Sequence, residues 1–230
     1  MTIDDTVNLL DAVTKLLAVL VWPTILAFVL FRFRAALGEF MTSLTEVSFK
    51  GGGIEASAKR RQAEAAAALG AAAVARPDTD TAPRDVTQET RAAAELVAEV
   101  VTPRVIRRAG RSTVLWVDDR PNNNVHERQA LEAVGVTFVL ATSTEEALEK
   151  VNQQSFEAII SDMGRPPDSQ AGYTLLDKLR DSGNRTPFII YAGSRAPEHR
   201  AEARRRGAIG CTNRPDELFE MVLSALGRKA

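Results

Sequence analysis

Three aspartates stand where two apolar segments end, and their side chains could together bind a divalent cation. Asp118 and Asp119 follow the apolar run 114–117, and Asp162 follows the run 158–161. If both runs are parallel strands of one sheet, their carboxyl ends meet at the edge where α/β folds bind ligands. Mg²⁺ takes oxygen ligands and keeps several waters, so two or three carboxylates suffice. The pattern predicts a site for Mg²⁺ and phosphate.

The spacing around these aspartates resembles the receiver domain of two-component response regulators over residues 112–227. Besides the aspartates, the matching residues are Pro166, Gly172, Gly207-Ala208 and Arg214-Pro215. The resemblance implies that Asp162 is the nucleophile that accepts a phosphoryl group from a histidine kinase, while Asp118 and Asp119 help to hold Mg²⁺. The chemistry agrees, because a carboxylate forms an acyl phosphate only where a hard cation offsets the charge on the phosphoryl oxygens.

Two residues depart from the family pattern, both among those that contact the phosphoryl group. Arg214 stands where receivers usually carry a lysine, and a planar guanidinium differs in geometry from a compact ammonium. We expect Arg214 to pair with Asp162 or a phosphate in a different way. Ala192 stands where the family has a threonine or serine hydroxyl, which alanine cannot replace. Ser194 is a candidate substitute, because Gly193 gives the intervening backbone freedom.

Three functions remain open for this part of the chain. The first is a receiver that accepts a phosphoryl group on Asp162 and then changes its assembly or its partner binding. The second is a pseudo-receiver that is not phosphorylated and acts as a membrane effector or an oligomerisation module. The third is a nucleotide or NAD hydrolase on the same fold, which is disfavoured because no glycine-rich phosphate loop follows the first strand. We expect no enzymatic activity beyond phosphoryl acceptance.

The elements that would position these residues alternate between strands and helices. Apolar runs bounded by turn residues predict strands, and apolar residues at helical spacing predict the helices between them. Continuously apolar strands that alternate with helices favour a parallel sheet covered on both faces. We therefore predict an α/β fold, a doubly wound five-stranded parallel sheet in the order 2-1-3-4-5. The predicted strands are 113–117, 137–140, 158–161, 188–191 and 208–212, and the helices are 125–133, 145–153, 173–182, 197–206 and 215–226.

An apolar run near the amino terminus predicts a transmembrane helix within residues 1–34. The run from Leu16 to Phe31 carries no charge and includes Trp22 and Pro23. About 20 helical residues cover the hydrocarbon core of a bilayer, and Pro23 is expected to kink the helix. A cleaved signal peptide is disfavoured because acidic residues precede the run, and a soluble core helix is disfavoured because the run lacks a polar face.

Basic residues follow the apolar run more densely than they precede it, so the carboxyl-terminal part is expected in the cytoplasm. This places the chain in the inner membrane of the cell as a single-pass protein with its amino terminus outside. The lone Cys211 agrees, because it excludes a disulfide within the chain. We expect Cys211 to be a small apolar filler near the fifth strand rather than a reactive thiol.

The segment between the span and the receiver-like domain, 111–230, predicts a mainly helical stalk. Residues 35–75 contain three glycines, flanked by 46–50 and 54–56, which predict either a short hairpin or a flexible hinge, and then an alanine-rich helix. Residues 76–88 predict a linker, and 89–110 a connecting helix that Pro103 interrupts. We expect homo-oligomerisation through the span and the stalk.

Composition bounds the remaining partners. The 230 residues carry a formal net charge of −1, and no basic domain or nucleic-acid-binding motif is present in the sequence. We therefore expect membrane lipid, a phospho-donor and other protein copies as partners, and no nucleic acid.

Overall fold

The computed structural model describes residues 53–75, 86–193 and 196–227. The predicted membrane span, the segment 35–52 and Ser194 lie outside these ranges. The chain divides into two compact units, Met1–Ile54 and Glu55–Ala230, and the second contains the fold described below. Within the described ranges, no helix combines the length and apolar character needed to cross a membrane.

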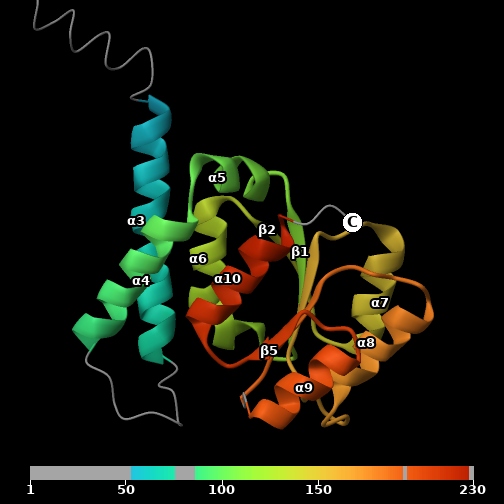
Figure 1. Cartoon of the computed structure of the whole chain (residues 1–230). Coiled ribbons are helices and arrows are strands. Elements are labelled where there is room, and N and C mark those ends of the chain that lie inside the picture. Colours follow the sequence, from blue (N-terminus) through green and yellow to red (C-terminus); the bar gives the residue numbers. More distant parts are fainter. Residues whose placement is uncertain (1–52, 76–85, 194–195, 228–230) are drawn as a thin grey trace, which may run out of the picture. The chain divides into compact units, whose positions relative to one another are not determined.

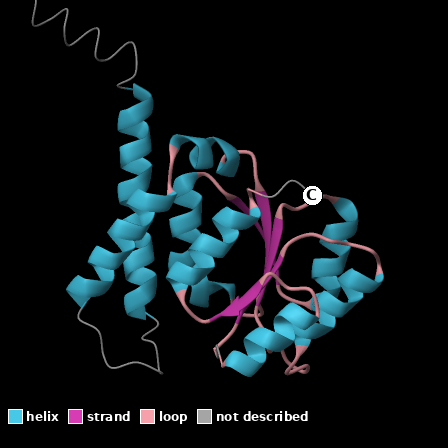
Figure 2. Ribbon diagram, in the orientation of Figure 1, coloured by secondary structure: helices cyan, strands magenta, loops and turns pink. Residues whose placement is uncertain are grey.

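The second unit is built on five parallel strands in the order β2-β1-β3-β4-β5 (Figure 2). This confirms the predicted sheet and its strand order. Three strands have the predicted bounds and β2 is one residue longer. β5 starts two residues later than predicted, because the Ala208 amide donates to the Ala203 carbonyl of the preceding helix at 2.9 Å. The strands are β1 Thr113–Val117, β2 Thr137–Ala141, β3 Ala158–Ser161, β4 Phe188–Tyr191 and β5 Gly210–Thr212.

Helices cover both faces of the sheet (Figure 1). On one face lie α6 (Val125–Val134) and α10 (Pro215–Ala225), and on the other lie α7 (Thr144–Gln153), α8 (Ala171–Asp181) and α9 (Pro197–Arg205). Because side chains alternate along a strand, Val114 and Trp116 join the core beneath α6 and α10, while Leu115 and Val117 join the other. The sheet is therefore buried on both sides.

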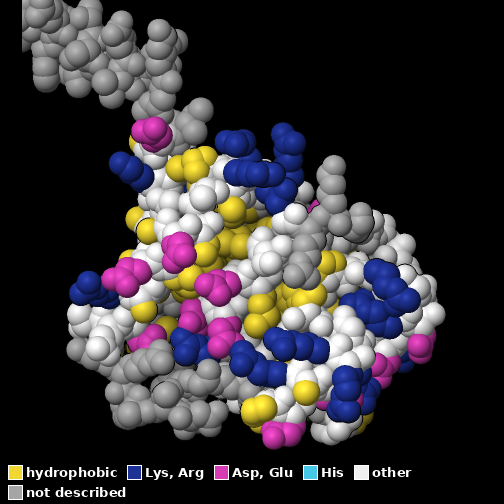
Figure 3. All heavy atoms as spheres, viewed as in Figure 1, with side chains coloured by type: hydrophobic (Ala, Val, Ile, Leu, Met, Phe, Trp, Pro, Cys, Tyr) yellow, Lys and Arg dark blue, Asp and Glu magenta, His cyan; other side chains and the backbone are white. Residues whose placement is uncertain are grey.

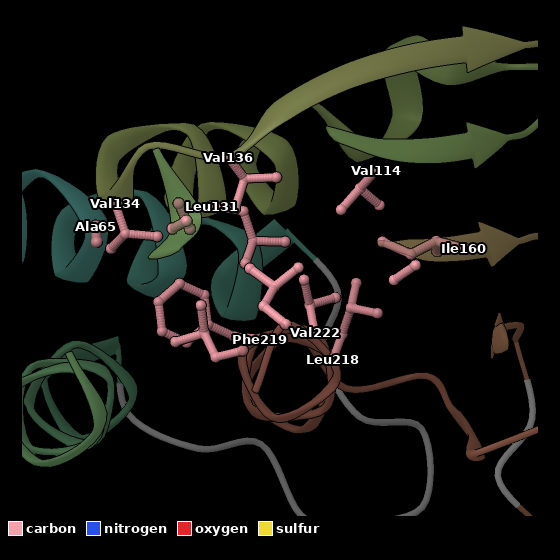
Figure 4. Close-up of a cluster of buried hydrophobic side chains, with 14 of the residues drawn as sticks. Ala65, Val114, Leu131, Val134, Val136, Ile160, Leu218, Phe219 and Val222 are labelled. Atoms are coloured by element: carbon pink, nitrogen blue, oxygen red, sulfur yellow. The ribbon is translucent and has the colours of Figure 1, made fainter. Parts of the chain in front are cut away.

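Two further helices add a layer outside α6 and α10. They are α3 (Gly53–Ala75) and α4 (Val86–Val100), and Leu69 and Val97 join the same buried cluster as Phe219 of α10. Figure 4 shows Ala65 of α3 beside Val134 of α6. The predicted stalk helices therefore share one hydrophobic core with the receiver-like fold.

Two details of the predicted stalk need correction. The strand expected at 54–56 is wrong, because α3 already begins at Gly53. The alanine-rich sequence that follows has high helix propensity, whereas an isolated hairpin is marginal on its own. The connecting helix α4 begins at Val86, inside the segment 76–88 that was predicted as a linker. The predicted interruption at Pro103 is confirmed, since α5 (Pro103–Ala109) begins there, with the Val105 amide donating to Thr102 Oγ1 at 3.3 Å.

Candidate functional site

The three aspartates meet at the carboxyl edge of the sheet. Val117 pairs with Ser161 in the register of β1 and β3, so the residues that follow these two strands leave the sheet side by side. Each of Asp118, Asp119 and Asp162 offers a carboxylate oxygen, and these oxygens lie within 4.8 Å of one another. The structure thus brings together the residues that the sequence singled out.

Asp118 is buried and held in place by two hydrogen bonds. The Arg120 amide donates to Asp118 Oδ1 at 2.7 Å, and Asn124 Nδ2 donates to Oδ2. Asn124 had the sequence position of a cap for α6, but its side chain makes no such cap. Asp119 is more exposed and pairs with the Arg120 guanidinium at 3.7 Å. Each carboxylate oxygen can accept a second bond, so both residues remain able to bind a cation.

Burial raises the pKa of Asp162 above its ordinary value, although the Met163 amide, which donates to Asp162 Oδ1 at 2.7 Å, works in the opposite direction. The negative charges of Asp118 and Asp119 raise the pKa further, whereas Arg165 lowers it. The ionised form of Asp162 is therefore held in an unfavourable environment. A bound cation would relieve the repulsion among the three carboxylates.

The donor set fits Mg²⁺. Mg²⁺ holds oxygens at about 2.1 Å, so two ligands on opposite sides of the ion lie about 4.2 Å apart. The 4.8 Å limit on the cluster is only slightly wider than this, and water completes the coordination in such sites. Asp118, Asp119 and Asp162 would hold the ion, which would offset the negative charge of a phosphoryl group.

Sequence reasoning missed Arg165, a buried cation beside the three aspartates. Its Nη1 donates to Ser161 Oγ at 2.7 Å and to the Asp162 carbonyl at 2.8 Å. Its Nη2 donates to Thr144 Oγ1 at 3.0 Å and to the Ala171 carbonyl at 3.1 Å. Burial lowers the pKa of Arg165, and the nearby carboxylates oppose that change. The guanidinium thus joins the end of β3 to the starts of α7 and α8. The only feature of the sequence that could have indicated this role was a charged residue between Asp162 and Pro166.

Replacing Arg165 with methionine is expected to lower the free energy of unfolding by about 3 kcal/mol, because four acceptors, three of them buried, lose their donor. Loss of the cation also leaves the aspartates more negative, so Mg²⁺ is expected to bind the folded variant more tightly than wild type. Chemical denaturation with and without Mg²⁺ measures both effects. Arg204→Met, at an exposed position of α9, is the matched control. Equal stability of the two variants would contradict the role given to Arg165.

Gly172 allows α8 to start directly against the end of β3. Its amide donates to the Met163 carbonyl at 2.8 Å, and a Cβ on Gly172 would lie 2.8 Å from the Asp162 carbonyl oxygen. Gly172→Ala is therefore expected to displace the backbone of Asp162 and to lower the free energy of unfolding by about 2 kcal/mol. Denaturation measures this loss, and Gly183→Ala is unsuitable as a control because Gly183 has a positive φ of 82°. Gly193→Ala, where a Cβ meets nothing within 4 Å, is the better control.

Of the two predicted switch residues that the structure describes, Arg214 is bonded away from the aspartates, whereas Ala192 follows β4 at the same carboxyl edge of the sheet. Arg214 Nε donates to Asp216 Oδ1 at 2.9 Å and Nη2 to Asp216 Oδ2, so its guanidinium is held by its own helix rather than by Asp162. Ala192 is buried at the end of β4 and, with Cys211, lines a hollow of 730 Å³. Cys211 is buried in β5, where burial raises the pKa of its thiol, as expected for an unreactive filler.

A family model matches the part of the chain that carries this site. Residues 114–223 match the family model of the response regulator receiver domain, so this part of the chain is a receiver domain. The solved receiver domain of Francisella response regulator 1452 is 26% identical, with 51% of this chain and 98% of that chain covered and a TM-score of 0.47. The chemotaxis response regulator CheY4 of Vibrio cholerae is 27% identical, with 51% and 97% covered and a TM-score of 0.42. No curated protein matches the chain.

Proposed function

We propose that this chain is a signalling protein of the inner membrane whose cytoplasmic receiver domain binds Mg²⁺ and accepts a phosphoryl group on Asp162. The observation that carries the proposal is the meeting of three carboxylates within 4.8 Å in a domain of this family. A histidine kinase or another phospho-donor supplies the group. The apolar run from Leu16 to Phe31 anchors the chain.

In this proposal, the chain's own residues prepare Asp162 for the reaction. The Met163 amide and Arg165 hold its carboxylate and its carbonyl, respectively, so that one carboxylate oxygen can act as the nucleophile. Asp118 and Asp119 gather the negative charge that attracts the cation. The phosphorus–oxygen bond forms on Asp162 as the bond from phosphorus to the donor breaks.

We further propose that the output passes through α6 to the outer helix pair α3 and α4. Two hydrogen bonds join α6 to the sheet: Asn124 at its start donates to Asp118, and Tyr191 of β4 donates its hydroxyl to Glu127 at 2.8 Å. Ala65 and Leu69 of α3 pack on the same buried cluster as α6. A change in the charge around Asp118 can therefore alter the position of the start of α6. Because α3 packs on the same cluster, its packing would change as well.

Incubation of the full chain with acetyl phosphate tests the proposal. We expect one phosphoryl group to be added to the chain when Mg²⁺ is present and none in its absence, as measured by intact mass. Peptide mapping after borohydride reduction is expected to identify Asp162. Labelling at another residue, or labelling that does not depend on Mg²⁺, would contradict the proposed chemistry.

A second function is favoured by the two altered switch positions. Ala192 has no hydroxyl, and Arg214 is bound by Asp216, so neither is ready to contact a phosphoryl group. A receiver of this kind can act through protein contacts alone, as a pseudo-receiver that controls clustering of the anchor. If wild type takes up no phosphoryl group and Asp162→Asn leaves signalling in cells intact, this second function is the better one. The helix pair and the membrane segment are then the proposed sites of homo-oligomerisation.

A further inference from the structure

Four arginines lie at helical spacing on and just after α5. They are Arg104, Arg107, Arg108 and Arg111, and residues three or four apart in a helix project from the same side. The amide of Arg111 donates to the Arg108 carbonyl at 3.0 Å, which continues the turn beyond the end of the helix. All four arginines line one hollow of 420 Å³, together with Glu157 and Leu226. Figure 3 shows Lys and Arg side chains gathered around α5, at the top of the view.

No described carboxylate neutralises these four side chains. Among the described residues, none of the four guanidinium groups lies within ion-pair distance of a carboxylate. Glu157 in the same hollow accepts instead from the Thr113 amide at 2.7 Å. By contrast, in the arginine-rich run around α9, Arg200 pairs with Glu217 at 2.7 Å, and Arg205 and Arg206 pair with Glu202. Within the ranges that the structure describes, the arginines around α5 are therefore an exposed cluster without ion-pair partners.

Stability of α5 does not account for the cluster. Like charges three or four residues apart destabilise a helix, and α5 carries them along one side. Arg107 and Arg108 lie in the last turn, where a cation is favourable, but Arg104 lies in the first turn, where it is not. The four positive charges therefore destabilise the protein when no ligand is bound, and a bound anion would offset this loss of stability.

The cluster lies beside the middle of α3 and away from the acidic site. Gln62 of α3 donates to the Val101 carbonyl at 2.6 Å, and Arg61 Nη1 and the Gly110 backbone both lie 3.1 Å from the point where a Gly135 Cβ would be. The cluster leads into the amino end of β1, whereas Asp118 follows its carboxyl end. A ligand there would leave the Mg²⁺ site open.

We propose that the arginine cluster binds the phosphate groups of anionic lipids and so seats the receiver domain on the membrane by its α5 side. Guanidinium groups match phosphate oxygens with paired hydrogen bonds, and a cytoplasmic leaflet attracts clusters of basic side chains. All four arginines are exposed, as contact with a flat array of headgroups requires. The choice of lipid as the source of the phosphate groups rests on the proposed membrane anchorage. The basic amino-terminal half of α3 is the part of this unit that lies nearest in sequence to the apolar run.

The test uses the full chain in nanodiscs, with a fluorophore attached after Ala230, since Leu226 lines the same hollow. Energy transfer to a headgroup-labelled lipid is expected to at least double when phosphatidylglycerol replaces part of the phosphatidylcholine, and to return to the lower value at high salt. The double variant Arg107→Gln/Arg108→Gln is expected to abolish the gain. The double variant Arg185→Gln/Arg204→Gln, at exposed positions far along the chain, is expected to retain it.

Three outcomes separate the possible failures. Equal transfer with and without phosphatidylglycerol in an anchored chain overturns the lipid proposal. Tight binding of inorganic pyrophosphate that Arg107→Gln/Arg108→Gln removes, without any effect of phosphatidylglycerol, assigns the cluster to a soluble phosphate and also overturns it. If alkaline carbonate releases the chain from vesicles, the anchorage fails. Flotation on phosphatidylglycerol vesicles that the double variant weakens about tenfold or more would then still support the site.

Discussion

Replacing Asp162 with asparagine is expected to abolish phosphoryl uptake and, at the same time, to stabilise the protein without Mg²⁺. Asparagine cannot form an acyl phosphate, so incorporation from acetyl phosphate should fall to the background of the unlabelled chain. The neutral amide also removes one of three neighbouring negative charges. Near pH 7 and without Mg²⁺, we expect the free energy of unfolding to rise by about 1 kcal/mol, after allowance for solvent screening.

The pH dependence of this gain has a defined sign. Burial, together with Asp118 and Asp119, raises the pKa of Asp162 in the folded state. Wild type therefore loses stability as the pH rises from the ordinary aspartate pKa, about 4, through the higher folded value, and the asparagine variant does not. The two proteins should converge below about pH 4 and differ at neutral pH.

Denaturation curves across this pH range measure the difference, and Asp181→Asn at an exposed position of α8 is the matched control. Saturating Mg²⁺ should reverse the order of stability. An ion at about 100 times its dissociation constant stabilises the folded protein by about 2.7 kcal/mol, and the variant has lost one of its ligands. A variant less stable than wild type at neutral pH without Mg²⁺ would show that Asp162 is not strained by its neighbours.

The sheet was predictable from the sequence because each strand carries its own signal. Apart from Ser161, the runs before Asp118 and Asp162 are apolar, as the central strands of a parallel sheet require, and turn residues bound them. Once the two runs are neighbouring parallel strands, the aspartates that follow them must lie at the same edge of the sheet, so their proximity was predictable as well. The edge strand β2 is partly exposed, and its end was less well defined in the sequence.

Residues whose roles depend on tertiary contacts were not predictable in the same way. Arg165 has four hydrogen-bond acceptors drawn from three different segments, and no local pattern connects Arg165 with Thr144 or Ala171. Asn124 stands at the N-cap position of α6, but its side chain forms no cap and its Nδ2 donates instead to the Asp118 carboxylate, a partner that no local pattern reveals. The packing of α3 was also hidden, because an alanine-rich helix has little apolar periodicity to indicate which side is buried.

Replacing Leu69 with aspartate is expected to detach α3 from the receiver domain and to lower the free energy of unfolding by about 4 kcal/mol. Leu69 is a large side chain of α3 that is fully buried, in a helix whose other buried residues are small. Removing a buried leucine costs about 2–5 kcal/mol, and a carboxylate in its place must either regain water or stay unpaired. Detachment of α3 costs less free energy than keeping a buried, unpaired carboxylate, because α3 forms an outer layer that can leave without opening the sheet.

Hydrogen exchange resolves detachment from general unfolding. The amides of α3 and α4 are expected to lose protection by about 700-fold, since 1.4 kcal/mol corresponds to a factor of ten and the expected loss is about 4 kcal/mol, while β1 and β3 lose less. Val74→Asp is the matched control, because Val74 lies on the same helix but is 45% exposed. Phosphoryl uptake on Asp162 should stay within about twofold of wild type, because no residue of α3 contacts the three aspartates in the described structure. If uptake is lost together with the protection of α3, the helix pair supports the reaction itself, and an output role that lies after phosphorylation is wrong.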